Sequence, residues 1–342
     1  MKLVTFESRQ DHAAGPRLGA IADTGAIVDL LTAAPAAGQT RIGDLGSMLA
    51  LIDGGAGALD LARAAYDAAT AGGTPEALHA PDTVRLFAPL PNPRRLRDCG
   101  CFLQHFRNAR AVRYRRLAAR EADPAAAMER FRAAGDLDIP DAWNDVPVML
   151  NANHLSVVGG DTDIVWPDGA HRLDYELEFA MVTGRAGRDI ARDQAAGHAF
   201  GYTIFNDVSA RDIQARDIAA QAGMGGRSKD FDTGNVVGPC IVTADEIGDP
   251  YALTMVARVN GEEWSRGSTS QMDHRFEDVL VHASRNQTVQ PGEIFGSGTV
   301  PSGCGLESDR YFNDGDTVEL EIEKIGILRN RVVKPAGWLD SW

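Results

Sequence analysis

The stretch LDYELEFAMV, residues 173–182, decides the fold, because it reads as a β-strand that carries charges on an otherwise apolar run. Working outward from it, four more runs have the same strand-like texture, at 148–150, 201–206, 253–259 and 317–322. Few long helical patterns interrupt these runs. The pattern predicts an α+β, β-rich domain rather than a doubly wound α/β sheet.

The residues before this domain have a different texture. Residues 1–85 predict a small N-terminal α/β domain, in which 2–6 form an edge strand and 20–31 form two short strands around the Asp23-Thr24-Gly25 turn. Apolar residues at three-to-four spacing predict helices over 42–51 and 58–69.

A Pro-rich connector, LFAPLPNP at 86–93, marks the predicted boundary, and 86–342 form the larger, catalytic domain. Inside it, residues 106–134 are rich in Ala and Arg, with helical spacing and a break at Pro124. We predict an inserted helical arm within 106–145. It is either a lid or dimer arm, or a solvated helix pair.

Composition excludes several classes of protein. The 342 residues carry 34 Lys and Arg against 48 Asp and Glu, a net charge of −14, which disfavours nucleic-acid and membrane partners. No run approaches the ~18 apolar residues of a membrane span, and the first residues lack a signal-peptide core. The cysteines contain no Cys-x-x-Cys pair, so we expect a reduced, cytoplasmic protein without a cysteine-rich zinc site; they are Cys99, Cys101, Cys240 and Cys304.

The charges of the deciding stretch point to a cation. Side chains two apart in a strand share a face, so Glu176 and Glu178 project together, about 6.5–7 Å apart along the strand. On a buried face, such a pair suits Mg²⁺, Mn²⁺ or Ca²⁺. Alternatively, the pair lies on the solvent-exposed face of an amphipathic strand. This is how we interpret the same Glu-Leu-Glu pattern at 319–321. Spacing alone leaves both open.

Other candidate residues are also ambiguous on pattern alone. Asp207 ends a strand-like run, but it can equally cap a helix over 209–218. Lys229 lies in the Gly-rich loop 223–234, which lacks the spacing of a phosphate-binding loop. Lys229 is therefore either a site residue or an ordinary surface lysine. Asp98 and His105 are seven apart and would share a face if that stretch were helical.

Four motifs in order break these ties. They are LDYELEFAMVTGRAGRDI (173–190), GYTIFNDVSARDIQ (201–214), SKDFDTGNVVGP (228–239) and PGEIFGSGTVPSGCGLE (291–307). Together they resemble the fumarylacetoacetate hydrolase family, from about residue 86 to 333. The resemblance implies a mixed β-sandwich or β-roll C-terminal domain and a homodimer.

The resemblance also implies a site. A divalent cation, Mg²⁺ or else Mn²⁺ or Ca²⁺, would be held by Glu176, Glu178, Asp207 and Asp98. His105 paired with Glu307 would be the base, and Lys229 would act with it. The residues implied to line the substrate pocket are Arg211, Gln214 and Thr299.

The implied reaction is hydrolysis of a C–C bond in a β-diketone or acylpyruvate within aromatic catabolism. His105 would take a proton from water, Lys229 and Gln214 would face the oxyanion, and the cation would stabilise the enolate leaving group. The alternatives are a decarboxylase, hydratase or isomerase of 2-oxo acids, or a non-catalytic binding protein with this fold. Met149 and Leu150 replace a Tyr found in fumarylacetoacetases, and the Arg for the substrate's acid end is Arg113 or Arg115.

Overall fold

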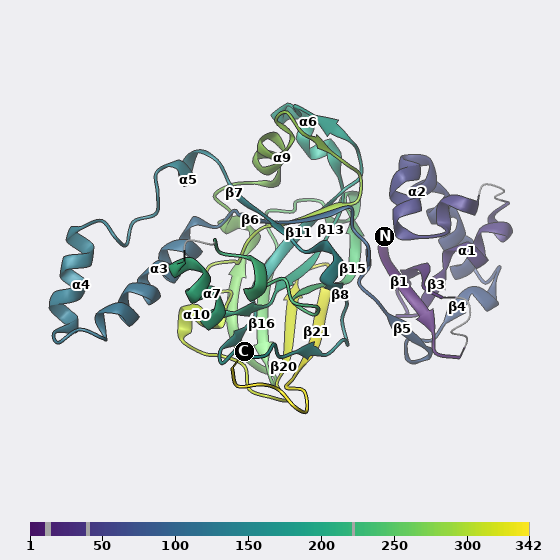
Figure 1. The fold of residues 1–342 in the computed structure, drawn as a ribbon. Helices are drawn as coiled ribbons and strands as arrows, with labels where there is room; N and C mark the ends of the chain where they lie inside the picture. Colours follow the sequence, from purple (N-terminus) through teal and green to yellow (C-terminus); the bar gives the residue numbers. More distant parts are fainter. Residues whose placement is uncertain (11–14, 39–41, 221–222, 342) are drawn as a thin grey trace.

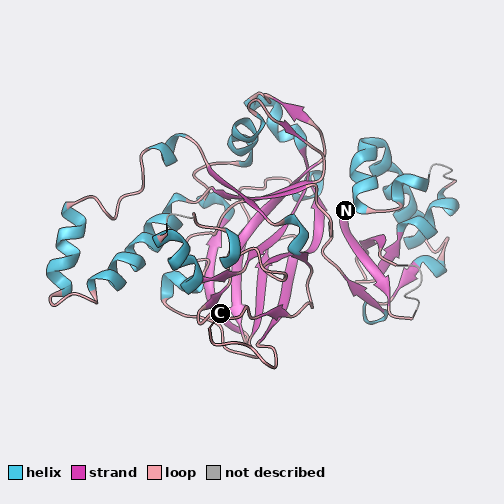
Figure 2. Ribbon diagram, viewed as in Figure 1, coloured by secondary structure: helices cyan, strands magenta, loops and turns pink. Residues whose placement is uncertain are grey.

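A large, mixed β-sheet forms the centre of the molecule (Figures 1 and 2). The computed structural model describes residues 1–10, 15–38, 42–220 and 223–341. In spatial order the strands of this sheet are β4 (Leu78–His79), β3 (Ile27–Asp29), β2 (Arg17–Ile21), β1 (Lys2–Ser8), β15 (Asn235–Thr243), β13 (Ala199–Asp207), β11 (Leu177–Thr183), β19 (Glu293–Gly296), β6 (Arg95–Gly100) and β7 (Val148–Ala152). Two short strands join it from the side, β5 (Val84–Leu86) on β1 and β8 (Val157–Val158) on β15.

A second sheet packs on the first. Its strands are, in order, β17 (Glu262–Ser268), β16 (Thr254–Val259), β20 (Thr317–Ile322), β21 (Gly326–Val333) and β9 (Ile164–Val165). Contacts join β11 to β16, β13 to β20 and β15 to β21, so the two sheets share one core. Phe179, Met255 and Leu320 are fully buried between them. The predicted β-rich fold is confirmed.

Short elements complete this body. Two small ladders pair β10 (Leu173–Asp174) with β14 (Ser209–Ala210), and β12 (Gly187–Arg188) with β18 (Thr288–Val289). The helices that surround the sheets are α6 (Arg192–Ala195), α7 (Arg211–Ala219), α8 (Ala244–Ile247), α9 (Phe276–Ser284) and α10 (Gly305–Ser308). Within the described ranges, no helix combines the length and apolar content needed to cross a membrane.

The N-terminal residues form a helix-covered edge of the large sheet. Here α1 (Leu30–Ala33) precedes α2 (Met48–Thr70), which begins where the Ser47 hydroxyl accepts the Ala50 N–H at 3.1 Å. Element α2 consists of two helices, as predicted, which meet at a kink where Gly55 has a φ of 61° that glycine adopts readily. Residues 42–45 form only a 3-10 turn.

The N-terminal strands are not separate from the rest. Strand β1 pairs with β15 through Lys2 opposite Val242 and Leu3 opposite Ile241, which makes the sheet continuous. In Figure 1 the N-terminal elements nevertheless stand to one side of the body. The division of the chain near residue 85 stays a prediction.

The inserted arm leaves the body on the side opposite to the N-terminal elements (Figure 1). It contains α3 (Leu103–Ala118), α4 (Pro124–Ala133) and α5 (Ala142–Asp145). The predicted break is where Asp123 caps α4 by accepting the Ala126 N–H at 3.0 Å, with Pro124 at the first helical position. The predicted helical arm is confirmed.

Candidate active site

Three carboxylates from neighbouring strands meet at one point. Asp98 of β6, Glu178 of β11 and Asp207 at the end of β13 each offer an oxygen, and these oxygens all lie within 4.8 Å of one another. Strand β19 lies between β11 and β6, and its Gly296 pairs with Ala180 on one side and Asp98 on the other. A Cβ at Gly296 would stand 2.5 Å from Glu178 Oε2, so this glycine leaves the space that the carboxylates occupy.

The carboxylates fit a cation. Glu178 Oε1 and Asp207 Oδ1 are buried and have no hydrogen-bond partner among the described residues, while Glu178 Oε2 accepts the Gly298 N–H at 2.9 Å. Burial, with Asp98 and Asp207 nearby, raises the pKa of Glu178 well above its usual value. Burial likewise raises the pKa of Asp207 to about 8, although Lys229 opposes this shift. Clustered, unpaired carboxylate oxygens are the donor set that hard divalent cations bind.

Glu176 lies beside this group rather than in it. The predicted continuous strand over 173–182 is wrong, because the Glu176 N–H bonds the Asn206 side chain at 3.1 Å and the ladder is interrupted between β10 and β11. Its carboxylate instead contacts Lys229 at 2.7 Å and Arg211 at 2.7 Å. Burial would raise the pKa of Glu176, but these two cations outweigh it and hold that pKa well below its usual range.

Lys229 is buried at the centre of the cluster. Its ammonium contacts Asp207 directly, Glu176 at 2.7 Å and Asp98 at 3.8 Å. The alternative of a surface lysine is therefore wrong. The carboxylate contacts stabilise the ammonium in a buried position. The helix-cap alternative for Asp207 is also wrong, since Ala210 precedes α7 and the carboxylate faces Lys229.

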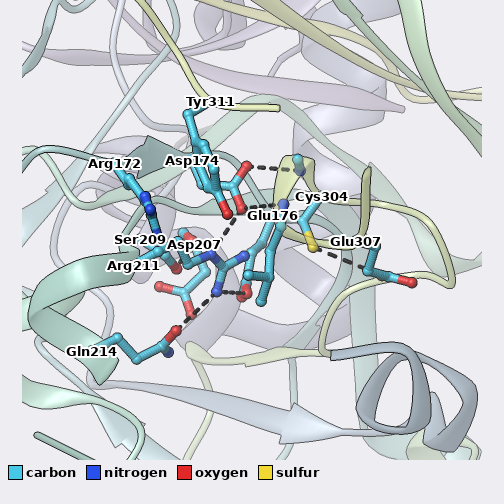
Figure 3. Close-up of polar contacts among 12 residues, drawn as sticks. Arg172, Asp174, Glu176, Asp207, Ser209, Arg211, Gln214, Cys304, Glu307 and Tyr311 are labelled. Carbon is cyan, nitrogen blue, oxygen red and sulfur yellow. Dashed lines mark hydrogen bonds and ion pairs between the residues drawn. The ribbon is translucent and has the colours of Figure 1, made fainter. Parts of the chain in front are cut away.

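Arg211 contacts the Glu176 carboxylate oxygen that Lys229 does not contact. Figure 3 shows its guanidinium between Asp174 and Glu176, with Gln214 next to it. Arg211 donates to Asp174 Oδ2 at 2.8 Å and to Gln214 Oε1 at 3.1 Å. The sequence reasoning missed Asp174, which also accepts the backbone N–H groups of Gly305 and Leu306 at 2.8 and 2.9 Å. An Asp on a buried, strand-like run was the available signal.

A His–Glu pair stands at the start of α3. His105 Nδ1 lies 2.8 Å from Glu307 Oε1, and the Asn108 amide donates to Glu307 Oε2. The Ser302 N–H adds a contact of 3.1 Å to each oxygen, so the carboxylate is fixed in place. Asn108 was missed, although it lies one turn after His105.

Asp98 and His105 do not share a helix, so that premise is wrong. Asp98 is a strand residue, because β6 pairs with both β19 and β7, and the helix begins only at Leu103. The seven-residue spacing instead spans a strand, a turn and the first turn of α3. Both residues still line the same cavity.

A cavity of about 610 Å³ joins these groups, a size typical of ligand sites. One wall is a single face of α3, from His105 to Leu117, with Arg120 just after the helix, and another is α7. Thr299 is buried on its lining, and its hydroxyl has no hydrogen-bond partner within the described ranges. Of the two candidate arginines, Arg113 lines this cavity and Arg115 does not.

A second set of potential ligand atoms overlaps the His–Glu pair. Atoms of His105, Cys304 and Glu307 lie within 4.8 Å of one another. Burial raises the pKa of the Cys304 thiol well above its usual value, which disfavours the thiolate that a metal needs. All four cysteines are free and buried.

Comparison with known proteins gives one family. Residues 118–333 match the model of the fumarylacetoacetate hydrolase C-terminal domain. The human mitochondrial oxaloacetate tautomerase is 37% identical over 189 residues, 55% of this chain and 59% of that protein, so the match spans about three-fifths of that relative.

Solved structures extend the likeness to almost the whole chain. The fumarylacetoacetate hydrolase of psychrophilic Exiguobacterium antarcticum is 29% identical, with a TM-score of 0.68 over 98% of this chain and 100% of that one. The 2-hydroxyhepta-2,4-diene-1,7-dioate isomerase of Mycobacterium marinum is 30% identical, with a TM-score of 0.55 over 75% of this chain and 80% of that one.

Proposed function

Because the chain belongs to the fumarylacetoacetate hydrolase family and is an enzyme of that superfamily, we propose that it hydrolyses a C–C bond of an acylpyruvate or related β-diketone. The observation that carries the proposal is the 2.8 Å contact between His105 and Glu307 on the cavity that also contains Asp98, Glu176 and Lys229. A base next to a cation site is the equipment that hydrolysis of an enolisable ketone requires.

Each side chain has a role in this proposal. Glu307 orients His105 through Nδ1, which leaves Nε2 to take a proton from water. The resulting hydroxide attacks the acyl carbonyl, and the Thr299 hydroxyl and the Lys229 ammonium are the donors for the oxyanion. Gln214 is less suited, because it accepts from Arg211 and donates to the Met224 carbonyl at 2.9 Å.

Asp98, Glu178 and Asp207 would hold the divalent cation, with Glu176 beside them. We expect Mg²⁺, with Mn²⁺ or Ca²⁺ as alternatives, because the donors are all carboxylate oxygens. Bound there, the cation would supply Lewis-acid stabilisation of the enolate that departs when the C–C bond breaks.

The same residues suit a second reaction. The relative named oxaloacetate tautomerase favours an enol–keto interconversion, in which His105 would move a proton between carbon and oxygen without water. The cavity of about 610 Å³ favours a substrate larger than a four-carbon acid. We therefore place C–C hydrolysis first and tautomerisation second.

One assay separates the two. The full chain with Mg²⁺ is incubated with a panel of acylpyruvates and with oxaloacetate, while enol absorbance is followed and released pyruvate and carboxylic acid are quantified. Hydrolysis predicts equal amounts of both products. Loss of enol absorbance without new products means tautomerisation and rejects the first proposal.

Variants connect the reaction to the site. His105→Ala and Glu307→Gln should each lower kcat by 10²-fold or more. Glu319→Gln, on the half-exposed face of β20, is the matched control and should leave kcat unchanged. The homodimer and the cytoplasmic location also remain predictions.

A further inference from the structure

A second cavity, of about 600 Å³, lies behind the active site, on the other face of β6 and β7 (Figure 1 shows the two strands near α9). Side chains of a strand alternate between its two faces. Asp98 and Leu150, which pair across the strands, face the first cavity, whereas the neighbouring pair Arg97 and Asn151 face the second. The two cavities are therefore separated by one layer of sheet.

The charged residues that line this second cavity are all basic. Four arginines contribute, and none of the described residues on its lining is acidic; they are Arg94, Arg95, Arg97 and Arg285. His154 and His282 also line it. Such clustering runs against the chain's net charge of −14. Like charges in one concave site repel unless a counter-ion is supplied.

Two of these arginines have a carboxylate partner and two do not. Arg94 pairs with Asp53 at 2.7 Å, and Arg97 pairs with Glu293 at 3.1 Å. In the described part of the chain, the side chains of Arg95 and Arg285 form neither a hydrogen bond nor an ion pair. Arg97 is 3% exposed, and its Nε is buried with no hydrogen-bond partner in the part of the chain that the structure describes.

We propose that this cavity is a binding site for a small anion with two or more negative charges, distinct from the substrate site. Arg95 and Arg285 are the groups that it would neutralise, and Arg97 forms the floor. Guanidinium groups suit both phosphate and carboxylate oxygens, and paired N–H donors give charge-assisted hydrogen bonds to either.

The test uses inorganic pyrophosphate as the probe, titrated calorimetrically into the metal-free full chain. Wild type should show saturable binding, and Arg95→Gln/Arg285→Gln should weaken it tenfold or more. The matched control is Arg107→Gln/Arg115→Gln, which removes the same charge from two exposed arginines on neither cavity and should stay within twofold. A third variant, Arg113→Gln/Arg120→Gln, removes two arginines from the active-site cavity and should keep the binding.

Three results would overturn the proposal. They are no saturable binding, an equal loss in the control variant, or a loss confined to the active-site variant. Melting temperatures check that each variant is folded. If the double variant fails to fold, Arg285→Gln alone decides, because that exposed side chain forms no hydrogen bond or ion pair with the described residues. The outcome is independent of the proposed hydrolase activity, since no substrate is present.

Discussion

Glu178 and Gly296 show how single residues shape the proposed cation site. The carboxylate is completely buried, and it fits only because the facing strand residue has no side chain. The backbone at Gly296 is not in the left-handed region, so space rather than conformation requires the glycine. A site of this kind is sensitive to one added methyl group.

Gly296→Ala should therefore disturb the carboxylates. Its Cβ would lie 2.5 Å from Glu178 Oε2 and 2.7 Å from Phe205 Cδ1. We expect Mg²⁺ affinity to fall at least tenfold and stability to fall by about 1–3 kcal/mol, measured by calorimetry and denaturant unfolding. Gly197→Ala, where a Cβ meets no atom within 4 Å, is the control. Wild-type affinity in Gly296→Ala would show that the carboxylates do not depend on this space.

Asn108 is a positioning residue for the base. Its amide donates to the Glu307 oxygen that His105 does not contact. Asn108→Ala should lower kcat about tenfold, roughly the loss of one hydrogen bond to a charged group, with KM and Mg²⁺ affinity unchanged. Steady-state kinetics check this, with exposed Arg107→Ala as the control. A change in KM alone would contradict this role.

At the element scale, helix α3 forms one wall of the cavity that we propose binds the substrate. Residues on one of its faces line the cavity over about four turns, beginning at His105. Arg110 and Arg116 on this face are engaged elsewhere, with the Asp136 carbonyl and with Asp309. Arg113 has no ion pair among the described residues and is left for an anionic substrate.

Arg113→Gln should raise KM about tenfold for an acylpyruvate whose acyl arm ends in a carboxylate, through loss of a charge-assisted hydrogen bond. It should leave KM unchanged for an acylpyruvate with a neutral arm. Arg115→Gln removes the same charge from the same helix outside the cavity and should change neither value. Equal effects of the two variants would indicate long-range electrostatics instead.

The large sheet connects metal binding to the stability of the whole molecule. The three carboxylates come from three of its strands, β6, β11 and β13, and β6 lies far from the other two along the chain. A cation that bridges them binds the folded chain and not the unfolded one. Its binding must therefore add to the free energy of unfolding.

At a Mg²⁺ concentration about 100 times Kd, the gain should be roughly 2.7 kcal/mol. Glu178→Gln should abolish this gain and leave the metal-free variant close to wild type, because the amide has the same shape and its oxygen can still accept the Gly298 N–H. Thermal unfolding with and without Mg²⁺ measures both. The control Glu319→Gln should keep the full Mg²⁺-dependent increase in the free energy of unfolding. The same increase in Glu178→Gln would show that the cation binds elsewhere.

The sequence by itself determined the β-rich body, the helical arm with its break at Pro124, and some of the strands, among them β1, β13, β16 and β20, because side-chain alternation and capping residues act over a few neighbours. It could not distinguish the Glu-Leu-Glu at 176–178 from that at 319–321 by spacing, since both have the same local pattern. The resemblance to a family was needed to choose the first.

Only the tertiary structure decided what each of these groups contacts. It gave Glu176 the partners Lys229 and Arg211, placed Asp98 on a strand, buried Lys229, and brought Asp174 to Arg211. These outcomes depend on which strands become neighbours. That is settled by long-range pairing and burial, which leave no periodic trace in the local sequence.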